Sequence, residues 1–203
     1  AVNSDPVVVG GLTPLTTIDF PGELAAVLFL QGCPWRCGYC QNSALLTRRH
    51  QPSVAWEEVI MLLEKRRHLL DAVVFSGGEP TLQSGLADAM QQVKAMGFKI
   101  GLHTAGIYPD RLQKLLPLID WVGMDIKSAT GDYQQITGIR NSAQRAWKSA
   151  QLLIESGIAH EFRTTVHPDM LDEEQLIALA DELTAIGAEH YILQDCRTTH
   201  CLD

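Results

Sequence analysis

The sequence predicts an α/β fold, an open three-quarter (βα)6 barrel built on a parallel sheet. Short, nearly continuous apolar runs alternate with segments of helical period, most of which end at glycine. Such apolar runs are typical of parallel strands that are buried on both faces. A complete eight-unit barrel takes about 250 residues, so a chain of 203 residues has room for about six units. A doubly wound sheet shows the same alternation and remains the alternative.

The elements are expected to follow one another in a single domain, residues 1–203, without a linker or a low-complexity segment. Residues 1–23 are expected to form an N-terminal lead-in, extended over 7–11 and then irregular because proline and glycine interrupt it. The six strands are expected at residues 24–30, 71–75, 99–104, 121–125, 161–166 and 190–193. The helices are expected at residues 53–70, 84–96, 109–116, 141–156 and 172–186.

Several helix ends carry sequence signals. Ser53 and Asn141 are expected N-caps, and Asp172 with Gln175 has the spacing of a capping box. Residues 31–52 show no clear period and exceed the roughly 12–15 residues of most structureless loops, which indicates a functional loop. Three glycines are expected to end helices: Gly97, Gly157 and Gly187.

The composition excludes several classes of protein. Lys and Arg total 16 against 24 Asp and Glu, a net charge of −8, which disfavours nucleic acid and anionic membranes as partners. No apolar run approaches the roughly 20 residues of a membrane span, and the N-terminus lacks the basic and apolar regions of a signal peptide. The five cysteines are too few for a disulfide scaffold, so a reducing compartment, the cytoplasm, is expected.

Three of these cysteines form one motif. Cys33, Cys37 and Cys40 have the spacing C-x3-C-x2-C directly after the first predicted strand. This spacing also fits one face of a helix, but Pro34 and Gly38 disfavour a helix, so we expect a loop of thiols.

The thiol loop has three interpretations. A structural zinc site needs four ligands, and no fourth Cys or His lies within the motif. Three thiolates that hold a 4Fe-4S cluster leave one iron without a protein ligand, and that iron is open to a substrate or cofactor. The spacing favours iron and sulfide over zinc, and inert thiols remain the third interpretation.

These residues carry a family resemblance. The motif, with Tyr39 before its last cysteine, resembles the signature loop of the radical S-adenosylmethionine (SAM) enzymes. Residues 77–80 (GGEP) resemble the segment after the second strand of that family, and residues 125–127 (DIK) resemble the DxK motif of glycyl-radical-enzyme activases. Residues 15–22, 193–197 and 202–203 are similar to the activating proteins of anaerobic ribonucleoside-triphosphate reductase. Those proteins usually run further, which leaves room for a missing C-terminal tail.

The resemblance implies cofactors and site residues. Cys33, Cys37 and Cys40 would ligate a 4Fe-4S cluster, and SAM would bind beside it. Tyr39 would lie against adenine, and Glu79 would accept from the methionyl amino group. The full set of implied SAM-binding residues is Tyr39, Gly77, Gly78, Glu79, Thr104, Asp125, Lys127 and Arg163.

Each of these residues also has a structural interpretation. The two glycines suit a strand-to-helix turn with unusual backbone angles, and Tyr39 suits ordinary packing. Asp125 and Lys127 project to one side of the chain and can form an internal salt bridge, and Arg163 can pair with Glu161.

Three further residues receive weaker interpretations. His103 stands where some activases carry an acid that helps hold a monovalent cation, so that cation site is doubtful and a hydrogen-bonded core histidine is expected. Cys196 and Cys201 are expected to be incidental thiols, because the resembled motif has phenylalanine at the position of Cys196.

The resemblance implies an enzyme that cleaves SAM reductively and generates a glycyl radical on a partner. That partner would be anaerobic ribonucleotide reductase, with an electron donor such as flavodoxin. A radical SAM enzyme that acts on a small molecule, as a deazaguanine synthase does, is the alternative. A zinc-stabilised binding module and a simple electron carrier are the alternatives from other classes.

Overall fold

The computed structural model describes residues 6–48 and 51–197 of the chain. In this part of the chain the strands form one sheet, in which β1 pairs antiparallel with β2 and all other neighbours are parallel. The strands are β1 (Val9–Thr16), β2 (Ala25–Leu30), β3 (Ala72–Gly77), β4 (Lys99–Thr104), β5 (Trp121–Asp125), β6 (Ala159–Val166) and β7 (Tyr191–Asp195).

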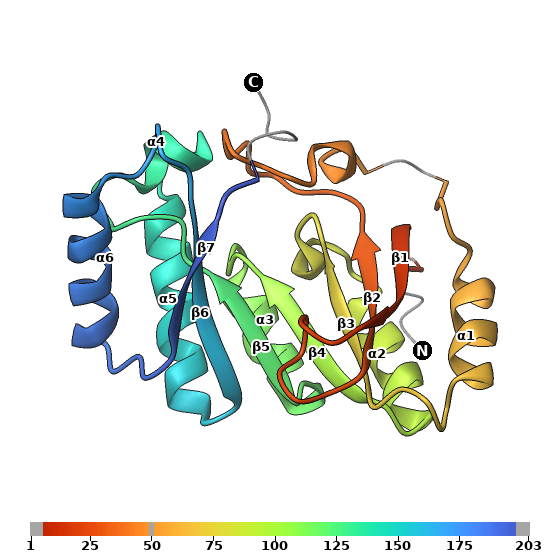
Figure 1. Ribbon diagram of the computed structural model, residues 1–203. Coiled ribbons are helices and arrows are strands. Elements are labelled where there is room, and N and C mark those ends of the chain that lie inside the picture. Colours follow the sequence, from red (N-terminus) through yellow and green to blue (C-terminus); the bar gives the residue numbers. More distant parts are fainter. Residues whose placement is uncertain (1–5, 49–50, 198–203) are drawn as a thin grey trace.

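The order of the strands in the sheet decides between the two predicted architectures. Their spatial order, β1 to β7, is the order in the chain, and β1 and β7 form the two edges (Figure 1). A doubly wound sheet reverses its order at a switch point, whereas a barrel winds in one direction. The open barrel is therefore confirmed, and each of the six predicted parallel strands is present.

The lead-in contains more structure than expected. The antiparallel strand β1 begins in the part of the lead-in that was expected to be extended, but it continues through Pro14 to Thr16, where an irregular path was expected. The pairing with β2 shifts register between Val9 and Gly11 and again between Thr13 and Thr16, which accommodates Gly10 and Pro14.

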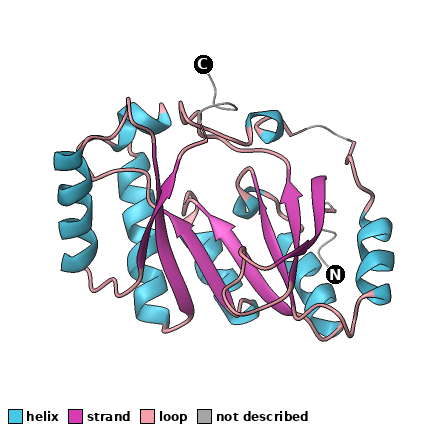
Figure 2. Cartoon of the chain, viewed as in Figure 1, coloured by secondary structure: helices cyan, strands magenta, loops and turns pink. Residues whose placement is uncertain are grey.

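Helices cover one face and the ends of the sheet (Figure 2). They are α1 (Trp56–Lys65), α2 (Leu86–Ala95), α3 (Pro109–Leu115), α4 (Tyr133–Thr137), α5 (Ser142–Ser156) and α6 (Glu173–Ala185). The described residues also form the 3-10 turns η1 (Ser43–Leu45), η2 (Pro80–Leu82) and η3 (Leu116–Leu118). The short helix α4 was not predicted. None of the described helices is long and apolar enough to cross a membrane.

The predicted helix ends are partly correct. Asp172 and Gln175 form both bonds of the capping box at the start of α6. The helix expected from Ser53 begins only at Trp56, because the Ser53 N–H donates to the Val9 carbonyl, 2.8 Å away, and is thereby held beside β1. Asn141 precedes α5 as expected but makes no side-chain cap bond. The expected glycine stops all have positive φ: Gly97, Gly157 and Gly187.

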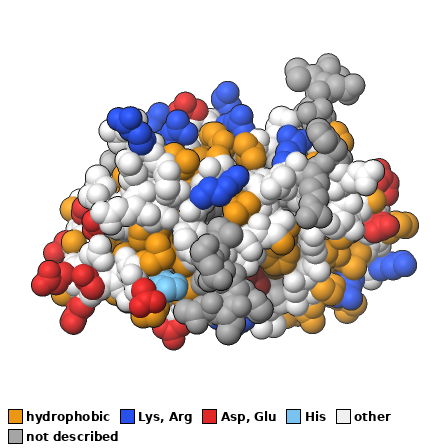
Figure 3. Space-filling model, turned by 90° about the horizontal axis from the view of Figure 1, so that it is seen from above, with side chains coloured by type: hydrophobic (Ala, Val, Ile, Leu, Met, Phe, Trp, Pro, Cys, Tyr) orange, Lys and Arg blue, Asp and Glu red, His pale blue; other side chains and the backbone are white. Residues whose placement is uncertain are grey.

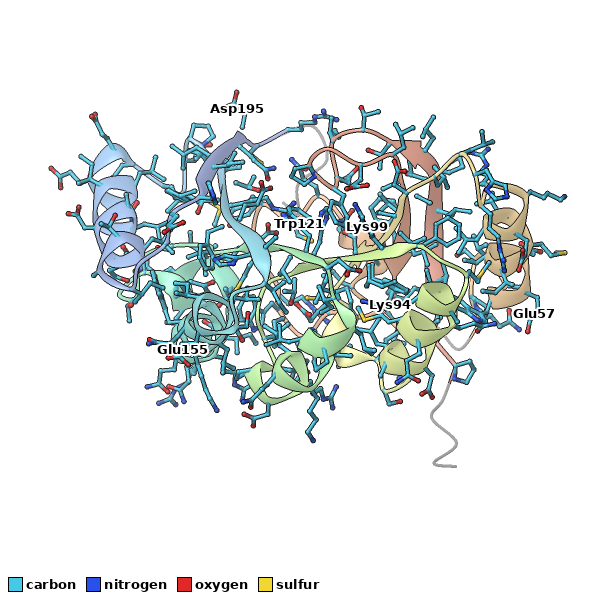
Figure 4. All side chains as sticks on the ribbon, turned by 90° about the horizontal axis from the view of Figure 1, so that it is seen from below. Glu57, Lys94, Lys99, Trp121, Glu155 and Asp195 are labelled. Carbon is cyan, nitrogen blue, oxygen red and sulfur yellow. The ribbon has the colours of Figure 1, made fainter. Side chains whose placement is uncertain are left out.

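The sheet has an apolar core on each face. The larger core packs between the sheet and the helices, and the smaller core lies on the opposite, inner face. The β1–β2 connection closes the inner face near the amino ends of the strands, where Phe20 stacks on Trp121 with ring centroids 5.2 Å apart. Figure 4 shows Trp121 on the side of the sheet away from the helices that carry Lys94 and Glu155. The barrel interior therefore has an apolar floor below its carboxyl edge.

Candidate active site

The predicted site residues gather at the carboxyl edge of the sheet. The thiol loop follows β2, Gly77 ends β3, Thr104 ends β4 and Asp125 ends β5. Arg163 differs, because it lies within β6 as the register partner of Asp125. Side chains from five consecutive parallel strands or their loops thus lie at one edge, as expected for an α/β barrel.

The motif of three cysteines forms a loop, as predicted, and backbone bonds hold it in place. The Cys33 N–H donates to the Leu46 carbonyl (3.1 Å), and the Arg36 N–H donates to the Thr137 carbonyl (3.1 Å). Trp35 is buried between them and meets the Tyr133 ring edge-on, 5.8 Å between centroids. The loop is therefore tied both to the segment after it and to α4.

The thiols lie in surroundings that favour their neutral form. Burial and, to a smaller extent, the nearby Glu79 carboxyl raise the pKa of Cys33 to about 12. Burial also raises the pKa of Cys37. Metal ligation requires thiolates, so binding of iron here would release protons. In the described part of the chain, no three His, Cys, Asp or Glu side chains converge as ligands of a single metal ion.

Arg36 covers the loop and was not predicted as a site residue. Its Nη1 donates to the carbonyls of Cys33 (2.6 Å) and Trp35 (2.8 Å), while its side chain is exposed. These bonds fix a positive charge beside the thiols. The signal available in the sequence was only its place within the motif.

Glu79 is completely buried and is held by its own loop and by the end of β4. Its Oε1 accepts from the Thr81 N–H, the Thr81 hydroxyl and the Thr104 hydroxyl. Among the described residues, its Oε2 accepts from the Ala105 N–H alone, at 3.0 Å. Burial raises the pKa of Glu79, and these hydrogen bonds oppose that shift. Oε2 retains capacity for a further donor, and Thr104 contacts the glutamate directly.

Gly77 and Gly78 are required by the packing of the chain itself. Gly77 has φ +110°, and a Cβ there would lie 2.4 Å from the backbone nitrogen of Leu30. A Cβ on Gly78 would lie 2.4 Å from the Gly32 carbonyl oxygen. Both glycines therefore let the loop after β3 lie against the end of β2. This role in packing agrees with the structural interpretation of the two glycines.

A network of charges joins β5 to β6. Asp125 Oδ2 lies 3.1 Å from Lys127 Nζ, and Asp125 Oδ1 accepts from Arg163 Nε at 3.0 Å. The internal salt bridge considered for Asp125 and Lys127 is present. Arg163 pairs with Asp125 rather than with Glu161, which was its partner in the structural interpretation of the sequence. Burial alone would raise the pKa of Asp125, but the two cations outweigh it and hold that pKa below its ordinary value.

Two tyrosines flank Lys127. Its Nζ lies 5.7 Å from the centroid of the Tyr39 ring, and its backbone N–H donates to the Tyr133 hydroxyl (3.1 Å). The Tyr39 hydroxyl is buried and has no hydrogen-bond partner among the described residues. Tyr133 belongs to the unpredicted helix α4, and no sequence signal identified it.

His103 is a hydrogen-bonded core residue, as expected. Its Nε2 lies 2.8 Å from the Asp19 carbonyl, which can only accept, so this nitrogen carries the proton and Nδ1 accepts from the Ser76 hydroxyl (3.3 Å). Burial and the Arg163 guanidinium lower the pKa of His103 to about 4. The imidazole is therefore neutral at pH 7.

Cys196 lies close to the site. It packs with Tyr39, Ile136 and Leu171 in a small apolar cluster, and Gln41 Nε2 is 3.8 Å from its sulfur. Cys201 and residues 202–203, which carried part of the predicted motifs, lie outside the described residues.

Comparisons with known proteins agree with this architecture. A family model described as the radical SAM superfamily matches residues 27–189. A protein of Methanocaldococcus jannaschii named as a glycyl-radical enzyme activating enzyme is 32% identical over 179 residues, covering 85% of this chain and 73% of that protein. The pyruvate formate-lyase 1-activating enzyme of Escherichia coli K12 is 28% identical over 177 residues, covering 83% of this chain and 71% of the relative.

Solved structures show the same fold. The crystal structure of Streptococcus suis SuiB bound to S-adenosylmethionine superposes with a TM-score of 0.66 at 17% identity. It covers 84% of this chain but only 40% of the SuiB chain, so the chain described here spans about two-fifths of SuiB.

Proposed function

This chain belongs to the radical SAM superfamily, in the group of glycyl-radical-enzyme activating enzymes, and from that premise we propose that it generates a glycyl radical on anaerobic ribonucleoside-triphosphate reductase. The cofactors of the superfamily are a 4Fe-4S cluster and SAM. We further propose that residues 1–203 form one radical SAM domain.

The chemistry of the donor set fits these cofactors. The three thiols Cys33, Cys37 and Cys40 lie on one loop with ordered backbone bonds, and thiolates are the usual ligands of iron–sulfur clusters. The orphaned Tyr39 hydroxyl lies in the same loop and has hydrogen-bonding capacity for a ligand. In this proposal the three cysteines ligate the cluster and Tyr39 lies against SAM.

Charged groups of both signs support binding of the methionyl part of SAM. Glu79 Oε2 has spare acceptor capacity for an ammonium group. Asp125 carries one negative charge against the two positive charges of Lys127 and Arg163, so this network has a surplus positive charge for a carboxylate. These oppositely charged groups beside a thiol loop are the observation that carries the proposal.

When bound, the cluster and SAM supply reductive cleavage of the sulfonium bond and abstraction of a hydrogen atom from the target glycine. The residues of this chain bind and orient the cofactors and limit access of water. The buried Trp35 ring, in the thiol loop, and the stacked Phe20–Trp121 pair, on the inner face of the sheet, border the site with apolar surface on the sides that face the protein interior.

The reductase is proposed on two grounds. Residues 15–22 and 193–197 resemble the activating proteins of that enzyme. The sheet is also open between its edge strands β1 and β7, and an open barrel can admit a peptide loop of a protein substrate.

A flavodoxin-like electron donor is proposed from the charge of the carboxyl edge. Figure 3, which looks onto this edge, shows Lys and Arg side chains across its middle and rear, with Asp and Glu mainly at its two ends. Arg36 is exposed here beside the thiols, and such a surface favours an acidic partner. The free thiols that cluster assembly needs favour the cytoplasm as the working compartment.

The first experiment is anaerobic reconstitution with iron and sulfide, followed by dithionite reduction in the presence of SAM and assay of 5′-deoxyadenosine. The parent protein should form product, Cys37→Ala should form none, and Cys196→Ala, which keeps the motif intact, should form product. A parent that stays colourless, binds zinc and forms no product would overturn the proposal.

A second experiment addresses the partner. The reduced, SAM-loaded protein is mixed with anaerobic ribonucleotide reductase, and the glycyl radical is measured by electron paramagnetic resonance. A radical on the reductase supports the proposed partner. Turnover of a pterin-like small molecule without any radical on the reductase would instead establish the small-molecule alternative.

A further inference from the structure

The side chain of Arg163 crosses a neighbouring strand. Arg163 on β6 is in register with Asp125 on β5, yet its Nη1 reaches to 3.2 Å from His103 Nε2 on β4. His103 is in register with Gly123, and Arg163 Nη2 lies 3.4 Å from the Gly123 carbonyl oxygen. The guanidinium therefore lies over β5 at Gly123.

Gly123 leaves the room for this path. A Cβ at Gly123 would lie 2.8 Å from Arg163 Nη1, 2.9 Å from Arg163 Cζ and 2.8 Å from Trp121 Cη2. Distances this short do not occur for real Cβ atoms, so any side chain would displace its neighbours. The φ of Gly123 is not in the left-handed region, so the backbone conformation does not require glycine here.

We infer that Gly123 is a positioning residue, whose missing side chain lets Arg163 lie across β5 and hold its guanidinium beside Asp125 at the SAM site. The inference rests on the proposed function, in which Arg163 contributes the surplus positive charge that receives the SAM carboxylate. Gly123 itself touches no cofactor in this assignment.

The contacts around Arg163 explain why its position depends on the space that the missing side chain of Gly123 leaves. Arg163 is buried, and within the described part of the chain its guanidinium donates to Asp125 and to the Gly123 carbonyl on the inner face. A long side chain retains this conformation only if its path is free, because ordering it already costs rotamer freedom that further strain would add to. A methyl group in that path would move the guanidinium away from both Asp125 and His103.

The experiment compares Gly123→Ala with Gly101→Ala. Gly101 lies on the adjacent strand, and its Cβ would be equally crowded, 2.9 Å from Val74 Cγ2 and 3.0 Å from Phe20 Cδ1, but it would not meet Arg163. Circular dichroism confirms folding, and SAM affinity of the reconstituted protein is measured by calorimetry. Gly123→Ala should weaken SAM binding about tenfold or more, whereas Gly101→Ala should change it less than about threefold.

A double-mutant cycle with Arg163→Met isolates the coupling. The effect of Gly123→Ala on SAM affinity should disappear in the Arg163→Met background, since the guanidinium is no longer there to be displaced. An equal effect of Gly123→Ala in both backgrounds would overturn the inference.

The cofactor-free protein provides an independent readout. Because the Arg163 guanidinium helps to lower the pKa of His103, its displacement by Gly123→Ala should raise that pKa from about 4. The pKa is read from the imidazole resonance in NMR titration, assigned with His103→Gln. An unchanged His103 pKa together with unchanged SAM affinity would refute the role of Gly123. A normal SAM affinity in Arg163→Met would instead refute the proposed role of Arg163.

Discussion

The hydroxyl of Thr104, at the end of β4, donates a 2.8 Å hydrogen bond to Oε1 of Glu79, in the loop that follows β3. Both residues are buried, and the Thr104 oxygen also accepts from the Gly106 N–H at 3.0 Å. One hydroxyl therefore links the glutamate to the turn after β4. A buried carboxyl held in this way keeps one orientation, which a ligand site requires.

Thr104→Val should lower the free energy of unfolding by about 2–3 kcal/mol, because Oε1 of the buried Glu79 loses one of its donors and the Gly106 N–H loses its acceptor. It should also raise the pKa of Glu79 further, since a donor to the ionised form is lost. Chemical denaturation measures the first effect. Thr130→Val is the control, because its hydroxyl bonds to Glu182 at an exposed position. Equal losses in both variants would contradict the role given to Thr104.

Tyr133→Phe should destabilise the protein by about 1–3 kcal/mol, because the partly buried backbone N–H of Lys127 loses its acceptor. Thermal and urea unfolding check this value. Tyr108→Phe is the matched control, since its ring stays under the Arg111 guanidinium, 4.6 Å from it. A neutral Tyr133→Phe would show that the hydroxyl does not support Lys127.

Gly77→Ala should cost far more than Gly22→Ala, although both glycines have positive φ. The Cβ at Gly77 meets the Leu30 backbone at 2.4 Å, whereas nothing lies within 4 Å of a Cβ at Gly22. We expect about 1–2 kcal/mol for Gly22→Ala from backbone strain alone. For Gly77→Ala we expect more than about 4 kcal/mol or loss of the folded protein, as in other steric clashes with a buried backbone. Urea midpoints rank the two variants, and similar midpoints would contradict the packing explanation.

The protein should lose stability as the pH falls from about 6.5 toward 4, in part because of His103. The folded-state pKa of His103 is lowered to about 4, so the unfolded chain takes up a proton first. This contribution is complete above the unfolded-state pKa and amounts to about 3 kcal/mol, because one unit of pKa shift corresponds to about 1.4 kcal/mol. His103→Gln should reduce the loss between pH 7 and pH 4 relative to the parent. Denaturation curves at several pH values test this, and parallel pH profiles would argue against a buried neutral imidazole.

The residues of the site illustrate what sequence reasoning can reach. The three cysteines, Glu79 and the Asp125–Lys127 pair were predicted as site residues from the family resemblance, and their places at the carboxyl ends of apolar strands supported that prediction, because parallel strands bring such ends together. The partner of Arg163 was not predictable. Alternation along β6 places Glu161 on the same face, and only the register between β5 and β6 makes Asp125 its neighbour.

Other features had no local signal. Tyr133 acts through a short helix without an amphipathic period, and Gly123 looks like any glycine within a strand. Ser53 was expected to cap α1, but its N–H bonds to Val9, a residue far away in the chain. In each case a contact between distant segments outweighs the local preference.

The sequence by itself determined the α/β class, the six parallel strands and the loop of thiols, because burial of apolar runs and the chemistry of closely spaced cysteines are local properties. Only the tertiary structure decided that the strands wind in one direction as an open barrel and that β1 joins as an antiparallel edge. It also decided how Arg163 crosses β5. Register, strand order and side-chain paths depend on contacts between segments far apart in the chain. The hydrophobic pattern of either segment alone does not show which segment it contacts.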